Sequence, residues 1–294
     1  MTSLGAERAP AEGLGAMEAA AWSPARRRLR RFLQNPAGVA ALAILVLLYI
    51  GAFAAPLVYR VSPLAANPLV SLAGIGPGHP LGTDELGRDE LARLIAGGQI
   101  SLVVGVVAMA VSVTVGTLVG MLAGFFQGAV ETVLMRLVDA WLAVPALILI
   151  LVEVTTFGNA PAVIIAVIGF TYWPQVARIM HAETLSLKRR EYVDASRALG
   201  SSPSRLMLRH ILPHLVPSMV VSGSLAIAWS ILTESALSFL GLGIQPPLAS
   251  WGNMLQNAQS YVYLDPLLAI LPGVLIVITV LAFNVLGNAV RDLL

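Results

Sequence analysis

The stretch EYVDASRALG at residues 191–200, followed by SSPSRLMLRHILP at residues 201–213, decides how this chain is organised. It is polar and charged, and it separates hydrophobic runs that are long enough to cross a bilayer. Gly200 suits the position just past a helix end, because a residue without Cβ adopts a positive φ at no steric cost. Ser202 and Pro203 then provide an N-cap and a first-turn proline for a second helix, which Pro213 is expected to end. Residues 183–217 are therefore predicted to form two short helices joined by a bend.

The first of these two helices has a modest apolar face. Tyr192, Ala195 and Leu199 fall at i, i+3 and i+7, which places them on one side of a helix. Positive charge surrounds this face, from Arg189, Arg190 and Arg197. A short helix of this kind is suited to docking on a partner protein.

The composition is that of an integral membrane protein. Hydrophobic residues make up 57% of the 294 positions and charged residues 12%, and the mean hydropathy is +0.82, outside the range of ordinary soluble domains. The chain has no cysteine, so a disulfide framework and a cysteine metal site are both excluded. Lys188 is the only lysine and no glycine precedes it, so the P-loop that cradles nucleotide phosphates is absent.

Hydropathy predicts an all-α, polytopic membrane protein with six transmembrane helices. The predicted spans cover residues 39–58, 100–124, 134–156, 160–179, 214–240 and 266–290. Residues 59–98 and 241–263 are then external loops. In the second span Ser112, Gly116, Gly120 and Gly124 lie four apart, a small-residue stripe that predicts close helix packing inside the protein.

Four regions follow from this division. Residues 1–24 are predicted to be a disordered cytoplasmic tail, 25–75 an interfacial helix and the first span, 76–98 an external loop with a short helix, and 99–294 a five-helix core that contains the loop at 183–217. The run RRRLRRFL at residues 26–33 also has the twin arginine of an export signal. The apolar run that follows is of spanning length, which favours an uncleaved anchor.

The distribution of basic residues predicts the orientation. With the amino terminus inside, 15 of the 18 Lys and Arg residues fall on the inner side, and Arg60, Arg88 and Arg93 fall on the outer side. Under the positive-inside rule both termini and the segment 183–217 are cytoplasmic.

Three stretches carry a resemblance to a known family. They are Asp194-Ala195-Ser196 with Gly200 and Leu212-Pro213, the external run HPLGTDELGRD at 79–89, and the external run LSFLGLGIQPP at 237–247 with SWGNML at 250–255. From about residue 26 onward the chain resembles permease subunits of ATP-binding-cassette (ABC) importers, specifically the C-type permease of the dipeptide, oligopeptide and nickel branch. The first stretch is similar to the cytoplasmic "EAA" coupling loop of such permeases. Asp194 stands where that motif has Glu, Ser196 replaces its second Ala, and His210 occupies a position that is usually apolar.

The resemblance implies a type I importer permease with a cytoplasmic coupling helix, in a bacterial inner membrane. The implied partners are a second permease subunit in a heterodimer, two ABC ATPase subunits, an external solute-binding protein and the lipid bilayer. This chain is then a transport subunit and no enzyme; it binds no cofactor, and ATP and magnesium belong to the ATPase subunits. The expected ATPase contacts are Glu191, Asp194, Ala195, Ser196 and Gly200, with Arg189 and Arg197 beside them. Dipeptides or oligopeptides are the first choice of cargo and nickel chelates or glutathione the alternatives, while the substrate-binding residues stay unidentified.

Charged residues in or near the spans suggest alternative functions. Asp139, Glu153 and Glu234 lie in or near spans, as in an ion- or proton-coupled secondary transporter. Structural pairing or snorkelling is the simpler expectation. Asp139 can pair with Arg136 one turn away, and the two glutamates lie towards outer helix ends, where water is near. A scaffolding subunit is a third possibility. A DNA-binding helix-turn-helix, and with it a nucleic-acid partner, is disfavoured because the segment lies between two membrane spans.

Two external features have simple structural interpretations. His79, Asp84 and Asp89 resemble metal ligands, yet Thr83 and Asp84 are expected to be helix caps and Asp89 adjoins Arg88. Trp251 is expected to anchor the chain at the outer membrane interface. No grouping of catalytic Ser, His and Asp residues is discernible.

Overall fold

The computed structural model describes residues 30–293, which form helices and loops but no β-strand. Their elements are α3 (Pro36–Val58), η1 (Pro68–Val70), α4 (Glu90–Phe126), α5 (Gly128–Leu142), α6 (Ala146–Phe157), α7 (Pro161–Lys188), α8 (Glu191–Ala198), α9 (Pro203–Arg205), the π-helix η2 (Leu206–Ile211), α10 (Leu212–Phe239), α11 (Trp251–Ala258) and α12 (Leu267–Arg291). The predicted all-helical class is confirmed. The tail and most of the basic run at 26–31 lie outside the described residues.

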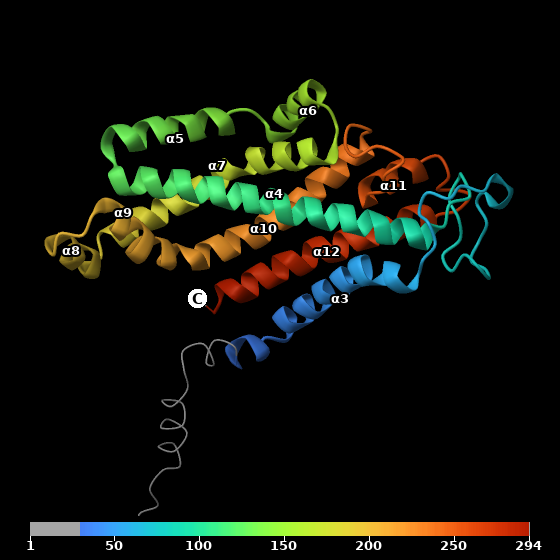
Figure 1. The fold of residues 1–294 in the computed structure, drawn as a ribbon, viewed down its shortest axis with the longest axis horizontal. Helices are drawn as coiled ribbons and strands as arrows, with labels where there is room; N and C mark the ends of the chain where they lie inside the picture. The colour runs from blue at the N-terminus through green and yellow to red at the C-terminus, as the bar shows by residue number, and fades with distance from the viewer. Residues whose placement is uncertain (1–29, 294) are drawn as a thin grey trace, which may run out of the picture.

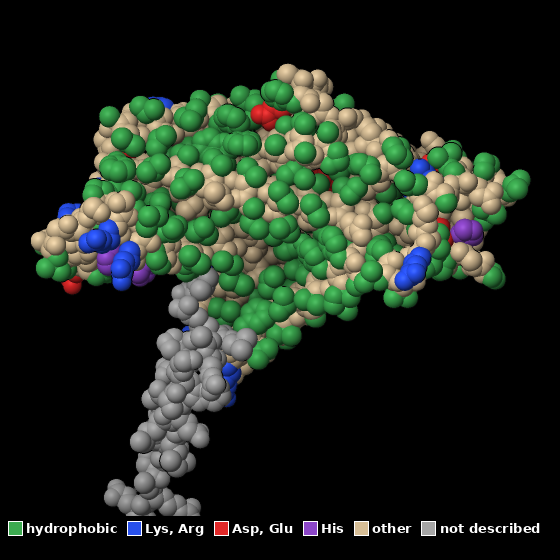
Figure 2. All heavy atoms as spheres, viewed as in Figure 1, with side chains coloured by type: hydrophobic (Ala, Val, Ile, Leu, Met, Phe, Trp, Pro, Cys, Tyr) green, Lys and Arg blue, Asp and Glu red, His purple; other side chains and the backbone are tan. Residues whose placement is uncertain are grey.

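The long helices run side by side, with short helices and loops at both ends of the bundle (Figure 1). The helices α4, α7, α10 and α12 form the body of the bundle, with α3 along one side and α5 and α6 along the other. At one end lie α8 and α9, and at the opposite end lie α11 and the loop that follows α3. Figure 2 shows hydrophobic side chains over the visible face between the ends and basic side chains gathered around α8 and α9. This distribution is that of a bundle embedded in lipid.

Five helices of the described chain are long and apolar enough to cross a membrane, and α5 with α6 adds a sixth passage if this bent pair counts as one. The single straight span predicted at 134–156 is wrong, because α5 and α6 meet at 86°. Pro145 is the N-cap residue of α6 and lies at the break. A proline has no N–H to continue the ladder, and its ring clashes with the preceding turn.

Two further boundaries differ from prediction. The helix α4 begins at Glu90 rather than near residue 100, because Asp89 caps it with a side-chain oxygen that accepts from Ala92 N at 2.8 Å. Pro213 does not end a helix; it lies in the first turn of α10. Helix α9, η2 and α10 therefore run on as one helical stretch, Pro203–Phe239.

The predicted small-residue stripe packs internally, against α7. A Cβ added at Gly116 would lie 2.7 Å from Trp173 O, and one added at Gly120 would lie 2.4 Å from Ala177 O. Ser112 donates to Gly169 O at 2.9 Å. The backbones of α4 and α7 approach this closely only because the stripe lacks side-chain bulk.

Candidate functional site: the segment at 183–217 and the loops at the opposite end

The helix α8 has one buried side chain, which packs against the bundle. Val193 is fully buried against Leu206, Ile211 and Leu215, which follow it in the chain. Its neighbour Tyr192 stacks on His214, with ring centroids 5.3 Å apart. The remainder of α8 is exposed apart from half-buried Ser196. Helix α8 is therefore anchored along one edge and free along the other.

The bend after α8 depends on Gly200. Its φ is +82°, Gly200 N donates to Arg197 O at 3.0 Å, and Ser201 N donates to Ser196 O at 3.2 Å. This pair of bonds is the Schellman ending of a helix, which needs a left-handed residue at the glycine position. The prediction that Gly200 lies just past a helix end at a positive φ is confirmed. At the other end of α8, the N-cap residue Arg190 forms no side-chain capping bond. Ser202 is the N-cap residue of α9, as predicted, and its side chain also forms no capping bond.

The predicted contact residues lie together on and around α8. Asp194 Oδ1 accepts from Arg197 Nη1 at 2.6 Å, and Ser196 Oγ lies 2.9 Å from Ser201 Oγ and 3.2 Å from His210 Nε2. Within residues 30–293 the exposed side chains of Arg189 and Glu191 form no ion pair. His210, at a position that is usually apolar in the motif, therefore has a structural role. Its contact with Ser196 joins α8 to η2, the segment that re-enters the bundle.

Apolar surface also faces outward beside these charges. Leu199 is 88% exposed at the tip of the turn, and Tyr192 and Ala195 are exposed as well. A single exposed leucine is ordinary. Here, however, Leu199 lies beside the Asp194–Arg197 ion pair, at the end of a short helix that Gly200 terminates. Such an apolar side chain next to charged ones is suited to a shallow groove of another protein.

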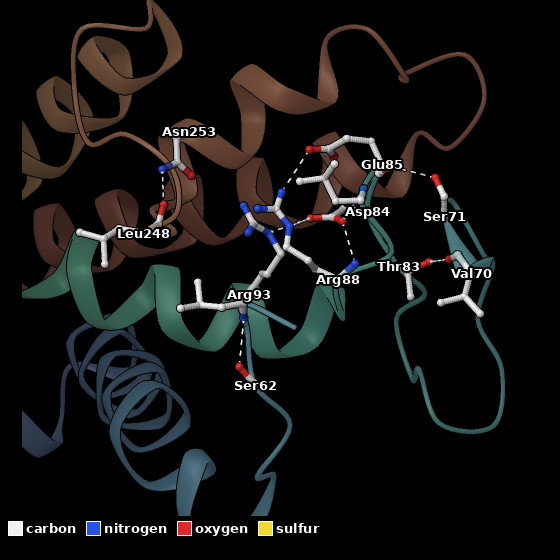
Figure 3. A network of polar contacts seen from close by, with 12 residues as sticks. Ser62, Val70, Ser71, Thr83, Asp84, Glu85, Arg88, Arg93, Leu248 and Asn253 are labelled. Carbon is white, nitrogen blue, oxygen red and sulfur yellow. Dashed lines mark hydrogen bonds and ion pairs between the residues drawn. The ribbon is translucent and has the colours of Figure 1, made fainter. Parts of the chain in front are cut away.

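The first external signature, residues 79–89, is built around a buried aspartate (Figure 3). Asp84 Oδ2 lies 2.6 Å from Arg88 Nε and 3.1 Å from Arg93 Nε, and the side chains of all three residues are at most 6% exposed. Glu85 binds the other side of Arg88, at 3.1 Å. Sequence reasoning missed this network, although the spacing of Asp84, Arg88 and Arg93 was a visible signal.

The prediction that Thr83 and Asp84 cap a helix is wrong, because the residue that caps α4 is Asp89. Thr83 Oγ1 donates to Val70 O and accepts from Ala73 N, so it joins two loop segments and caps no helix. Asp84 Oδ1 accepts from Leu86 N and Arg88 N, both at 2.9 Å, within the loop.

Asp89 gathers several of the loop residues. Its Oδ2 accepts from Tyr59 Oη and lies near His79 Nδ1, both at 2.9 Å. Burial and this hydrogen bond raise the pKa of Tyr59 to about 12. His79 and Asp89 thus meet, while Asp84 is engaged by two arginines. Among the described residues no cluster of three potential ligands has the geometry to hold a metal ion.

The second external signature is folded over a buried glutamate. Glu234 is fully buried in α10 and accepts from Ser238 Oγ at 2.7 Å and Ser101 Oγ at 3.1 Å. Of the two roles expected for Glu234, structural pairing is the one observed; it does not reach toward water. Trp251 opens α11, is 2% exposed, and donates from Nε1 to Leu94 O at 3.1 Å. The expectation of an interfacial tryptophan anchor is wrong, because this indole locks α11 onto α4.

The other charged residues in the spans have different surroundings. Asp139 pairs with Arg178 on α7 at 2.7 Å, so the predicted pairing with Arg136 is wrong. Glu153 lies on α6, at a hollow between α6 and α7.

Comparison with known proteins supports the sequence-based resemblance. The family described as "Binding-protein-dependent transport system inner membrane component" matches residues 116–294. A second family, "N-terminal TM domain of oligopeptide transport permease C", matches residues 23–73. Together the two matches cover residues 23–73 and 116–294.

Curated relatives are similar over almost their whole length. The oligopeptide transport system permease protein OppC of Escherichia coli (strain K12) is 42% identical over 275 residues, covering 93% of this chain and 90% of the relative. The glutathione transport system permease protein GsiD of Pectobacterium atrosepticum is 38% identical over 277 residues, covering 92% and 91%.

Among solved structures, an inward-facing form of the MetNI methionine ABC transporter matches with a TM-score of 0.57 and 19% identity. The match covers 68% of this chain and 96% of that one. At this identity the likeness concerns the fold.

Proposed function

Because the chain belongs to the family of binding-protein-dependent transport system inner membrane components, we propose that it is the permease subunit of an ATP-driven importer of dipeptides and oligopeptides. It is a multi-pass protein of the bacterial inner membrane and a transport subunit. The observation that carries the cargo assignment is the 42% identity to OppC over 93% of the chain.

In this proposal α8 receives the force of ATP hydrolysis from a partner. The sequence has no P-loop, so the work has to enter through a surface that an ATPase subunit can push. Helix α8 and the residue Arg189 before it offer such a surface. The side chains of Arg189, Glu191, Asp194, Ala195 and Arg197 are exposed, while buried Val193 ties the helix to the bundle. Ser196 and Gly200 act by holding the turn.

The full assembly we propose has a second permease, two ATPase subunits with ATP and magnesium, and an external solute-binding protein. The inner end is assigned to α8 and to both termini. A cysteine at Ser201 in the cysteine-free chain tests this orientation. In sealed right-side-out vesicles a membrane-impermeant thiol reagent should leave it unlabelled until the vesicles are opened; labelling before opening contradicts the orientation.

Transport itself is tested with the complete assembly in liposomes. We expect ATP-dependent uptake of a labelled dipeptide or tripeptide that exceeds uptake of nickel and of glutathione. The 38% identity to GsiD makes glutathione the second candidate, and preferential uptake of glutathione would replace the peptide assignment. Uptake that follows a proton gradient and ignores ATP would overturn the importer assignment in favour of secondary transport.

A further inference from the structure

The hollow between α6 and α7 combines apolar walls with one carboxylate. It has a volume of about 460 Å³, and its walls include the aromatic residues Trp141, Phe157 and Phe170. Glu153 is the single charged residue that lines it. We propose that this hollow, the α6–α7 pocket, lies on the water-filled cargo path and binds a cationic group of the cargo through Glu153. The inference rests on the proposed role as an importer permease and identifies a cargo contact within it.

The depth of the pocket follows from the lengths of the helices. Lys188 Nζ, at the end of α7, donates to Phe125 O at 2.5 Å and Gln127 Oε1 at 3.0 Å, so the inner ends of α4, α5 and α7 meet there. Helix α5 has 15 residues, which is ~22 Å at 1.5 Å per residue. The hydrocarbon core of a bilayer is about 30 Å thick. The outer end of α5, and α6 beyond it, therefore lie at membrane depth.

An ion pair on this side of the bundle argues that the side does not face lipid. The side chains of Arg178 and Asp139 pair across α7 and α5 and are 55% and 47% exposed. Charged side chains in spans face the protein interior or a water-filled cavity, because hydrocarbon solvates them poorly. The surface over α5 and α6 is mostly hydrophobic, with a small group of acidic atoms on it (Figure 2).

The break between α5 and α6 gives an independent argument. Ala143, Val144 and Pro145 are exposed, and in the described chain no backbone N–H reaches the carbonyls of Leu142, Ala143 or Val144. Irregular backbone of this kind at membrane depth is found where protein covers it or water reaches it. The ion pair and the break thus both indicate that protein or water covers the part of α5 beside the pocket.

The polar atoms of the pocket indicate what it binds. Glu153 Oε2 and Trp141 Nε1 are buried and form no hydrogen bond of ordinary geometry within residues 30–293, although buried polar groups usually have one. The hydroxyl of Thr171, which donates to Val167 O, is the polar group beside the carboxylate. A carboxylate beside aromatic rings attracts ammonium and guanidinium groups. The amino-terminal ammonium and basic side chains of peptides belong to this class.

The pocket can be tested by thiol labelling, because the chain has no cysteine of its own. Ala162 is exposed and lines the pocket. With Ala162→Cys in the complete assembly, we expect a cationic water-soluble thiosulfonate to react about tenfold faster than an anionic one, because the carboxylate attracts one and repels the other. Adding Glu153→Gln should bring the two rates close to equality. Adding Glu131→Gln, on α5 outside the pocket, should leave the ratio unchanged.

Three results would overturn the inference. The first is no reaction with either water-soluble reagent, which would mean that lipid or the second permease covers the pocket. The second is equal rates for the two reagents, and the third is a ratio that Glu153→Gln leaves unaltered. Labelling does not require transport. A ratio that depends on Glu153 in an assembly that moves no peptide would therefore preserve the pocket and refute the importer role instead.

Discussion

Replacing Gly200 tests whether the shape of the turn after α8 matters for coupling. Its φ is +82°, and an added Cβ meets nothing within 4 Å. The cost of a side chain is therefore the backbone strain alone, about 1–2 kcal/mol for alanine in the left-handed region. That cost lowers the population of the native turn about tenfold. Valine should cost more because its branched Cβ is poorly tolerated at positive φ, and asparagine less.

The assay is ATP-driven peptide uptake, measured beside the ATPase rate of the same complete assembly in liposomes. Uptake per ATP hydrolysed should fall in the order Gly, Asn, Ala, Val, and Gly200→Val should abolish uptake and uncouple the ATPase. Membrane insertion should be unchanged, because position 200 is exposed and open.

Gly128 is a matched control for strain. It also has a positive φ, +59°, with nothing within 4 Å of an added Cβ, and it lies in the α4–α5 turn. Gly128→Val should keep the ratio of uptake to hydrolysis. Wild-type uptake by Gly200→Val, or equal uncoupling by the two valine variants, would refute the assigned role of the turn.

The remaining predictions concern the external end. Asp84→Asn removes the anion between two buried arginines, which typically costs about 3–5 kcal/mol of folding free energy. We expect little folded protein in the membrane, measured as the fraction of protein that is monodisperse after extraction in detergent. Gly87→Ala places a Cβ 1.9 Å from Asn67 O and should also prevent folding, whereas Gly273→Ala, with its nearest neighbour at 3.7 Å, should fold normally. Trp251→Phe loses one buried hydrogen bond and should lower the melting temperature through a loss of about 1–3 kcal/mol; an unchanged melting temperature would show that the indole N–H contributes nothing.

Local chemistry predicted the parts of the fold that depend on neighbouring residues. Hydropathy located the long helices because burial in lipid demands continuous apolar runs, and Gly200 marked its turn because no other residue adopts that φ as readily. The start of α4 was misplaced because Glu90 and Arg93 are charged. They are accommodated in a helix because distant groups in the external network surround them.

Contacts between distant segments could not be predicted from the sequence. Asp139 has Arg136 one turn away, yet it pairs with Arg178, which only the packing of α5 on α7 brings near. The burial of Trp251 likewise depends on how α11 folds back onto α4. The candidate residues of α8 could be predicted from the sequence. The α6–α7 pocket could not, because it depends on the 86° bend between α5 and α6.

The uninterrupted helical stretch from Pro203 to Phe239 has a geometric consequence for the molecule. Its 37 residues measure ~55 Å at 1.5 Å per residue. One end adjoins the Gly200 turn and the other carries Glu234 and Ser238 beneath the external loop. A rod of that length amplifies rotation: tilting about its inner end by about ten degrees sweeps the far end through ~10 Å. In the proposed importer, a small displacement at the inner end, where partner subunits would hydrolyse ATP, would thus be magnified at the end that receives cargo.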